Sequence, residues 1–429
     1  MTRFRELPLA LRVLFLAAFV NRAGMFVFPL LTVYLVRGKD LSPGQAGLMI
    51  SVGSTGLLVG SLLSGPLCDL RGRRPALLTA LLLNAAGYLG LATLDGPPWT
   101  YTALLFAALV GMGMFGPASN TLIADLTTPE QRPFAYTVSY IGNNLGMGIG
   151  PLLGGVAAAY SYHVMFAGNI VAGLLCAALI AVWVPADRAR GEGRGGSEDE
   201  GAGRQARSPA EAGAGKAWTG HGHVLALVLI SFFYVAPLIG IEYTLPLAIT
   251  TVLDESASLV GVVYTINSVV VVGLGLVAEK RIPRYGTKSL LVVSGLLWAA
   301  GMAAIAFFFS LPAILLSTVV WTLGEIIASV VVPTYIADHA DKRRVGSLMA
   351  LNGFVLGVAR LVVPVGLGTL WQFQGHGPVF FTLLACPLVG IAAFALLRVR
   401  NSPAAAPATE PTHPSDTAST TASPTGKQT

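Results

Sequence analysis

Long apolar runs dominate this sequence and limit what the chain can fold into. Counting the runs between polar or turn-rich breaks gives twelve candidate helices. About 20 apolar residues, at a rise of about 1.5 Å each, cross the roughly 30 Å hydrocarbon core of a bilayer. The sequence therefore predicts an all-α integral membrane protein with twelve transmembrane helices, at residues 9–36, 45–68, 75–94, 100–124, 133–159, 163–184, 223–252, 257–279, 288–309, 312–337, 345–371 and 378–397.

The composition agrees with a membrane environment. Hydrophobic residues make up 54% of the chain and charged residues only 11%, against about 25% charged in an ordinary soluble domain. The net charge of +6 does not indicate nucleic acid, because the basic residues gather in loops. Cys68, Cys176 and Cys386 lie in or beside apolar runs and favour neither a disulfide framework nor a metal site. We expect the lipid bilayer to surround the protein. We expect no cofactor, metal or nucleic-acid partner.

The basic residues also predict the orientation of the chain. Of 27 Lys and Arg residues, 23 fall in the terminal segments and in loops on one face. Only Arg37 and Lys39 fall in loops on the other face, and Arg22 and Arg360 lie inside helices. Short loops rich in Lys and Arg stay in the cytoplasm. Both termini are therefore expected to be cytoplasmic.

The predicted helices divide six and six around a polar segment. Residues 185–220 are rich in Gly, Ala, Arg, Glu and Ser and read as a flexible cytoplasmic linker. It separates an N-terminal bundle, 1–184, from a C-terminal bundle, 221–400, and residues 401–429 read as a disordered cytoplasmic tail. We assign the linker and the tail no function.

The two halves repeat each other in sequence. Ile123-Ala124-Asp125 recurs as Ile336-Ala337-Asp338, and Gly65-x-x-x-Asp69 recurs in altered form as Gly275-x-x-x-Glu279. Repeated six-helix halves are typical of alternating-access carriers, in which one bundle rocks against the other around a central site. The halves are thus expected to be pseudo-repeats.

The polar loop after the second predicted helix carries a family resemblance. Gly65-x-x-x-Asp69-x-x-Gly72-Arg73-Arg74 resembles the loop motif of the major facilitator superfamily, apart from Leu70 where a basic residue is usual. The resemblance covers all twelve helices and implies the major facilitator fold, as a monomer in a bacterial inner membrane. It also implies that Arg73 pairs with Asp125 and that Asp69 meets the start of helix 345–371.

Together these residues would form a latch between the bundles that favours the outward-facing state. The alternative is that the charges only set topology and cap helices. The predicted latch cluster consists of Gly65, Asp69, Gly72, Arg73, Arg74 and Asp125.

The helix at 133–159 carries a glycine-rich run that resembles the motif of proton-coupled antiporters in the same superfamily. The resemblance implies a face that seals against helix 257–279 and hinders leakage, since glycines let backbones approach closely. Glycine packing without any bearing on transport direction is the alternative. The residues concerned are Gly146, Gly150, Pro151, Gly154 and Gly155.

Charges within apolar helices are the candidates for a transport site. Asn21-Arg22 lies in a first helix similar to those of bacterial drug-efflux members. The family arrangement would place Arg22, Glu242 and Glu325 around one central cavity. Glu325 and Arg360 fall at similar depth, so they could instead neutralise each other. A buried carboxyl group resists ionisation, and we hypothesise that Glu242 or Glu325 carries a coupling proton.

Two transport functions fit these observations. The first is proton-coupled export of small amphipathic compounds, such as a drug or natural product. The second is import of a small solute such as a sugar, an amino acid or an organic anion, for which Arg22 would suit an anion. A membrane enzyme is disfavoured, because the sequence has no His-Glu-x-x-His, serine elbow or phosphate-binding loop.

Overall fold

The computed structural model describes residues 7–128, 130–185, 222–281, 285–339 and 345–396. The predicted linker, apart from residue 185, and the predicted tail lie outside these residues. Helices account for almost all of the described chain. The first group comprises α2 (Leu9–Ala23), η1 (Phe28–Leu30), α3 (Leu31–Val33), η2 (Tyr34–Gly38), α4 (Pro43–Arg71), α5 (Arg73–Thr93), α6 (Pro98–Leu126), α7 (Arg132–Tyr160) and α8 (Tyr162–Trp183).

The second group follows the linker. It comprises α9 (Gly222–Ile230), α10 (Phe232–Thr251), α11 (Ala257–Arg281), α12 (Thr287–Phe308), α13 (Leu311–His339), α14 (Val345–Gln374) and α15 (His376–Leu396).

Eleven stretches of the described chain are long and apolar enough to cross a membrane, so the protein is a multi-pass membrane protein. The predicted fifth helix, α7, is not among them, although its 29 residues equal the length of α4 and α6. Asn143, Asn144 and the glycine run make α7 less apolar than its neighbours. The count of twelve spans therefore stays a prediction, with α7 as the twelfth.

The first predicted helix, 9–36, is interrupted in the structure. It stops at Ala23 and resumes as the short turns η1, α3 and η2. Pro29 sits inside η1, where its missing N–H cannot continue an α-helical ladder. Within this break, the backbone N–H of Val27 donates to Oδ1 of Asn169 on α8, at 3.3 Å. The predicted helix 223–252 is likewise divided at Ser231, between α9 and α10.

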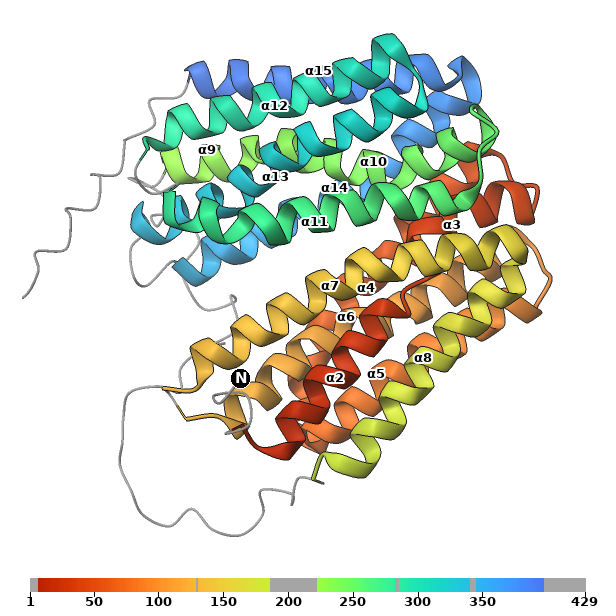
Figure 1. Ribbon diagram of the computed structural model, residues 1–429, viewed down its shortest axis with the longest axis vertical. Coiled ribbons are helices and arrows are strands. Elements are labelled where there is room, and N and C mark those ends of the chain that lie inside the picture. Colours follow the sequence, from red (N-terminus) through yellow and green to blue (C-terminus); the bar gives the residue numbers. More distant parts are fainter. Residues whose placement is uncertain (1–6, 129, 186–221, 282–284, 340–344, 397–429) are drawn as a thin grey trace, which may run out of the picture.

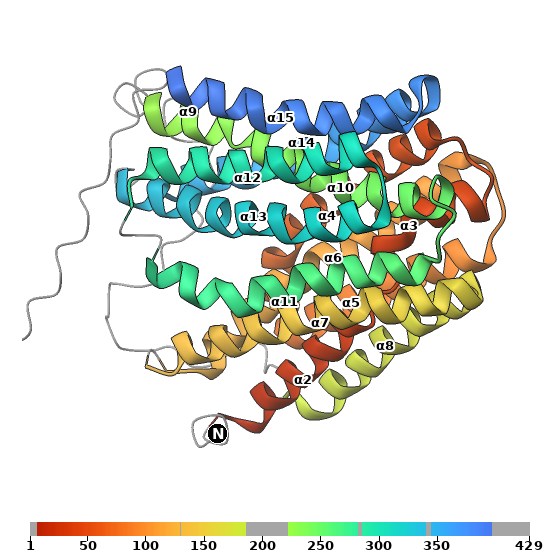
Figure 2. The ribbon, with the colours of Figure 1, turned by 45° about the horizontal axis from the view of Figure 1, so that its top comes forward.

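The ribbon shows two groups of helices, α2–α8 and α9–α15, lying side by side (Figures 1 and 2). They meet mainly along two seams, α4 against α14 and α7 against α11. We call the two ends of the molecule the Lys39 end, which carries the turns at 38–43 and 251–257, and the Arg73 end, which carries the turns at 71–73 and 126–132.

The seams are tight at the Lys39 end. A Cβ built on Gly368 of α14 would lie 2.5 Å from the carbonyl oxygen of Pro43, and one on Gly155 of α7 would lie 2.5 Å from that of Ala257. Toward the Arg73 end, a Cβ on Gly65, Gly353, Gly142 or Gly273 would meet nothing within 4 Å. The two groups of helices also diverge toward this end in Figure 1. The bundles are therefore joined at the Lys39 end and spread at the Arg73 end.

Candidate substrate and proton sites

An ion pair joins α10 to α14 in the second bundle. Nη1 of Arg360 donates to Oε2 of Glu242 at 3.0 Å, and the two side chains are 22% and 25% exposed. The guanidinium carbon lies 5.8 Å from the ring centre of Phe28, which belongs to the first bundle. The alternative of a Glu325–Arg360 pair is wrong for this structure. Similar depth on consecutive helices does not determine which side chains pair, because the partner also depends on how each helix is rotated about its axis.

Glu325 on α13 has a different environment. Its Oε2 accepts a hydrogen bond from Nδ2 of Asn267 on α11, at 3.0 Å, and the same amide lies 3.0 Å from Oγ1 of Thr322. Among the described residues, Glu325 forms no ion pair. It lines a cavity of about 110 Å³, shared with Glu242 and Tyr264, whose walls are mostly the apolar side chains Leu238, Ile241, Leu245, Ile249, Val260, Val263 and Trp321. The carboxyl group is thus held by an amide in apolar surroundings.

Arg22 lies in a separate cavity inside the first bundle. This cavity has a volume of about 220 Å³ and is lined from α2, α4, α5, α6, α7 and α8. Nη1 of Arg22 lies 3.0 Å from the thioether sulfur of Met25, and no described carboxylate forms an ion pair with it. Asn21 lines the same cavity. Arg22, Glu242 and Glu325, which were predicted to share one site, therefore line two different cavities: the Arg22 cavity lies within the first bundle, and the cavity of the two glutamates is lined by the second bundle and by Met147 of α7.

The glycine run of α7 lies between these two cavities. Asn143 lines the Arg22 cavity and Met147 lines the Glu325 cavity. A Cβ on Gly146 would lie 2.6 Å from Cβ of Arg22, so the arginine side chain packs directly on this glycine. One helix thus contacts the surroundings of both charged groups.

The run has two packing faces rather than one. Gly146, Gly150 and Gly154 recur every four residues and face the first predicted helix; a Cβ on Gly154 would lie 2.7 Å from Cα of Phe26. Gly155 faces α11, as expected, and Gly261 of α11 packs on the backbone of Pro151 and Leu152. The predicted seal against helix 257–279 thus uses only part of the motif.

The turn between α4 and α5 is built around Gly72. Its backbone has φ 93° and ψ 168°, a region almost confined to glycine. The turn brings Nε of Arg73 to 2.6 Å from Oδ2 of Asp125 on α6, which is the expected pair. Arg74 donates to the carbonyl oxygen of Ala181 on α8. Three helices are tied together here.

Among the described residues, two members of the latch cluster make no such contact. Gly65 has open space where a Cβ would be, and Asp69 is exposed. The expected partner of Asp69, at the start of the helix 345–371, adjoins residues 340–344, which lie outside the described chain. The acidic residues of the predicted repeat, Glu279 and Asp338, have side chains outside the described set.

Polar contacts join the two bundles at the Lys39 end. Nη2 of Arg37 lies 3.1 Å from Oδ1 of Asp254 in the other bundle. The hydroxyl of Tyr243 donates to the carbonyl oxygen of Pro43 at 2.5 Å, and Oγ of Ser42 lies 3.0 Å from Oε1 of Gln372. These contacts hold the Lys39 end closed.

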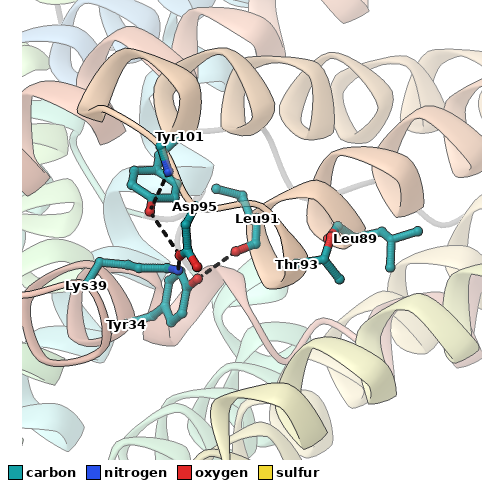
Figure 3. A network of polar contacts seen from close by, with 8 residues as sticks. Tyr34, Lys39, Leu89, Leu91, Thr93, Asp95 and Tyr101 are labelled. Carbon is teal, nitrogen blue, oxygen red and sulfur yellow. Dashed lines mark hydrogen bonds and ion pairs between the residues drawn. The ribbon is translucent and has the colours of Figure 1, made fainter.

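A second network lies at the same end within the first bundle (Figure 3). Nζ of Lys39 lies 2.5 Å from Oδ1 of Asp95, and the hydroxyl of Tyr34 donates to the carbonyl oxygen of Leu91 at 2.6 Å. Burial acts against the charge of Lys39, but the hydrogen bond with Asp95 and the nearby tyrosines outweigh it and raise the pKa of Lys39. The hydrogen bond with Lys39 lowers the pKa of Asp95.

Asn267 is a functional candidate that the sequence does not single out. It is one of several asparagines in apolar helices, and nothing in the sequence sets it apart. Its importance comes from facing Glu325 across α11 and α13. The amides of Asn84 and Asn169 in the Arg22 cavity were also missed. Asparagine inside an apolar run was the available signal, but only the packing shows which asparagines share a cavity.

Comparison with known proteins identifies the family. The sequence profile described as Major Facilitator Superfamily matches residues 14–364 and 229–421. The chain is 26% identical over 395 residues to the uncharacterized MFS-type transporter YttB of Bacillus subtilis, covering 90% of this chain and 94% of that protein. Multidrug resistance protein MdtH of Salmonella typhimurium is 27% identical over 166 residues, covering 38% of this chain and 40% of MdtH.

The fold agrees with this assignment. A crystal structure of a mutant of the peptide transporter POT superposes with a TM-score of 0.71 at 16% identity, covering 90% of this chain and 94% of that chain. At this identity the likeness concerns the fold alone. The chain belongs to the major facilitator superfamily, and it is a membrane transporter rather than an enzyme.

Proposed function

We propose that this transporter exports small amphipathic compounds, such as a drug or natural product, in exchange for protons. The observation that carries the proposal is Glu325, a carboxyl group in an apolar cavity whose described partner is an amide and not a cation. An unpaired carboxyl in such surroundings gains by taking up a proton, because the neutral form needs no counter-charge. Glu242, in contrast, has its charge balanced by Arg360.

The exchange then follows from alternating access. We place both termini and the Arg73 end in the cytoplasm, so the spread bundles correspond to a state open to the cytoplasm. In this state Glu325 would release its proton and a compound would bind from the cytoplasm. After the bundles rock, the compound would leave and Glu325 would be protonated from outside. The proton gradient thereby drives export.

The motifs of the first bundle take supporting roles in this proposal. The Arg73–Asp125 pair and Gly72 would hold the Arg73 end of α4, α5 and α6 rigid while the bundles move. The α7 glycines would let α7 slide closely over Phe26 and α11. Similarity to a multidrug resistance protein over part of the chain favours export over import.

Transport into inverted membrane vesicles tests the direction and the coupling. A panel of fluorescent amphipathic compounds, cationic, neutral and anionic, is offered outside the vesicles with and without an acid interior. The proposal predicts accumulation that requires the acid interior and stops when a protonophore removes it. Accumulation driven instead by an acid exterior would establish proton symport and reject export by exchange. Vesicles lacking the protein are the control.

A further inference from the structure

The Arg22 cavity has the features of a recognition site, and the proton hypothesis does not use it. Its volume of about 220 Å³ is twice that of the Glu325 cavity, about 110 Å³. Apolar side chains supply part of the wall, including Met25, Leu57, Leu81 and Phe115. The remaining lining side chains are polar: Asn21, Arg22, Asn84, Tyr88, Ser119, Asn120, Ser139, Asn143 and Asn169. Among these lining residues there is one cation and no acid.

The charge of Arg22 is not balanced by the described protein. Its contact with Met25 is to a neutral thioether, and the four described ion pairs involve other residues. A cation within a membrane bundle is costly unless a counter-charge or water compensates it. The α7 backbone packs closely on Arg22 at Gly146 and Gly150, so the stem of this side chain is held in place. An anion entering the cavity would supply the missing counter-charge.

Asparagine side chains with unused hydrogen-bonding groups line the same cavity as this cation. Among the described residues, Asn21 and Asn143 have no hydrogen-bond partner, although both line the cavity. Asn169 uses its oxygen to accept from Val27 N–H, at 3.3 Å, which leaves its NH₂ group able to donate. An arginine with nearby amide NH₂ groups matches a carboxylate, whose two oxygens accept several hydrogen bonds.

We propose that this cavity binds the carboxylate of an amphipathic organic anion, and that such anions are the substrate class of the transporter. The apolar part of the compound would contact the apolar wall that includes Leu57 and Phe115. The proposal rests on the transport function argued above and narrows its substrate. It also gives the substrate and the proton different sites. Arg22 would bind the substrate anion and Glu325 would bind the proton, with α7 between the two cavities.

Binding measured on the purified full-length protein in detergent tests the proposal without any proton gradient. Three probes share one aromatic ring system and differ in charge: naphthoate, naphthamide and naphthylmethylamine. Each is titrated while the melting temperature is recorded, since a ligand that binds the folded state raises it. Wild type is expected to be stabilised by naphthoate and much less by the amide or the amine.

Variants test whether a preference for the carboxylate probe arises in the Arg22 cavity. Arg22→Gln is expected to weaken naphthoate binding about tenfold or more, the loss expected for one charged hydrogen-bonding partner, and to abolish the preference for the carboxylate. Arg22→Lys keeps the charge and should retain the preference. Arg71→Gln, the same change at an exposed arginine, should behave as wild type. Should Arg22→Gln fail to fold, Asn143→Ala serves as the second test and should also weaken naphthoate binding.

Three results would overturn the proposal: equal stabilisation of wild type by all three probes, no stabilisation by naphthoate up to millimolar concentration, or a carboxylate preference that survives in Arg22→Gln. The assay is independent of proton coupling, so Glu325→Gln should keep the preference. If gradient-driven transport is absent while Arg22-dependent carboxylate binding is present, the proposal of proton exchange is rejected and the proposal of a carboxylate site is retained.

Discussion

Glu242 and Glu325 line the same cavity, but their neighbouring side chains give them different electrostatic environments. Glu242 lies against Arg360, whereas Glu325 lies against Asn267. The sequence identified both residues as stranded charges but gave only their depth along the helices. Which side chains meet depends on helix rotation, and this is set by packing between distant parts of the chain. The roles of the two glutamates therefore separate only in the structure.

Neutralising each glutamate should affect stability differently. Glu242→Gln leaves Arg360 with no carboxylate in a partly buried position, and we expect a loss of about 1–3 kcal/mol. Glu325→Gln keeps an oxygen that can accept from Asn267 and removes an unbalanced charge, so stability should stay within about 0.5 kcal/mol of wild type or rise. Thermal unfolding of both variants in the same detergent checks this. A larger loss in Glu325→Gln than in Glu242→Gln would contradict the assignment.

At the scale of elements, α7 is the helix whose packing matters most. Its hydropathy is diluted by glycine and asparagine, and these same residues let it pack on α2 and α11 and line the Arg22 cavity. The glycine motif was recognisable in the sequence. The sequence did not show that the motif has two packing faces, because the faces depend on where α2 ends and the chain turns at Gly24–Val27.

Two glycines of α7 provide a matched pair for testing this packing. Gly154→Ala places a methyl group against the Phe26 backbone and should cost about 1–3 kcal/mol through overpacking. Gly142→Ala, in the same helix, meets nothing within 4 Å and should be neutral or slightly stabilising. Melting temperatures and transport rates are compared for the two variants. Equal effects at both positions would show that the close approach seen at Gly154 is unimportant.

The Lys39–Asp95 contact ties η2 to the turn between α5 and α6 and predicts a pH dependence. The pKa of Asp95 is lowered, so its contribution is present above the ordinary aspartate pKa of about 3.9 and is lost as the pH falls through the lowered value. The raised pKa of Lys39 gives a contribution that is present below about 10.4 and is lost as the pH rises through the raised value.

Asp95→Asn removes the charge on one side of this contact. We expect a small loss of stability at neutral pH, because Asp95 is exposed and water screens the pair. The loss should shrink as the pH falls from the ordinary aspartate pKa through the lowered value, because the wild-type carboxylate is progressively protonated over this range. Melting curves across this acid range check the prediction. A loss that stays constant down to the acid limit would mean that the Asp95 charge does not stabilise the fold.

At the scale of the whole molecule, the helical segments were largely predictable and the conformation was not. Ten of the twelve predicted segments match single helices, because a membrane span must be a long apolar run. The two exceptions, at Gly24–Val27 and at Ser231, are local breaks within predicted spans. Which end of the bundles is closed depends on contacts such as Tyr243 with Pro43, which join residues far apart in sequence.

The closed Lys39 end predicts how the molecule responds to a broken contact there. Arg37→Asp places two acidic side chains together at the Asp254 position and should favour opening of this end. The double variant Arg37→Asp with Asp254→Arg restores opposite charges and should return to wild type. A cysteine introduced at Gly65, in a background lacking the native cysteines, reports access at the Arg73 end through its rate of maleimide labelling. Slower labelling in the single variant alone is expected; unchanged labelling would contradict coupling between the two ends.

The proposed role of Glu325 is to carry the proton that drives transport. It is tested most directly by comparing two assays of one variant reconstituted in vesicles: accumulation driven by a proton gradient, and exchange of labelled for unlabelled compound without a gradient. Glu325→Gln should lose gradient-driven accumulation and keep exchange, because exchange requires no net proton movement. Glu255→Gln, at an exposed loop position, should keep both. Gradient-driven accumulation by Glu325→Gln at the wild-type level would show that Glu325 does not carry this proton.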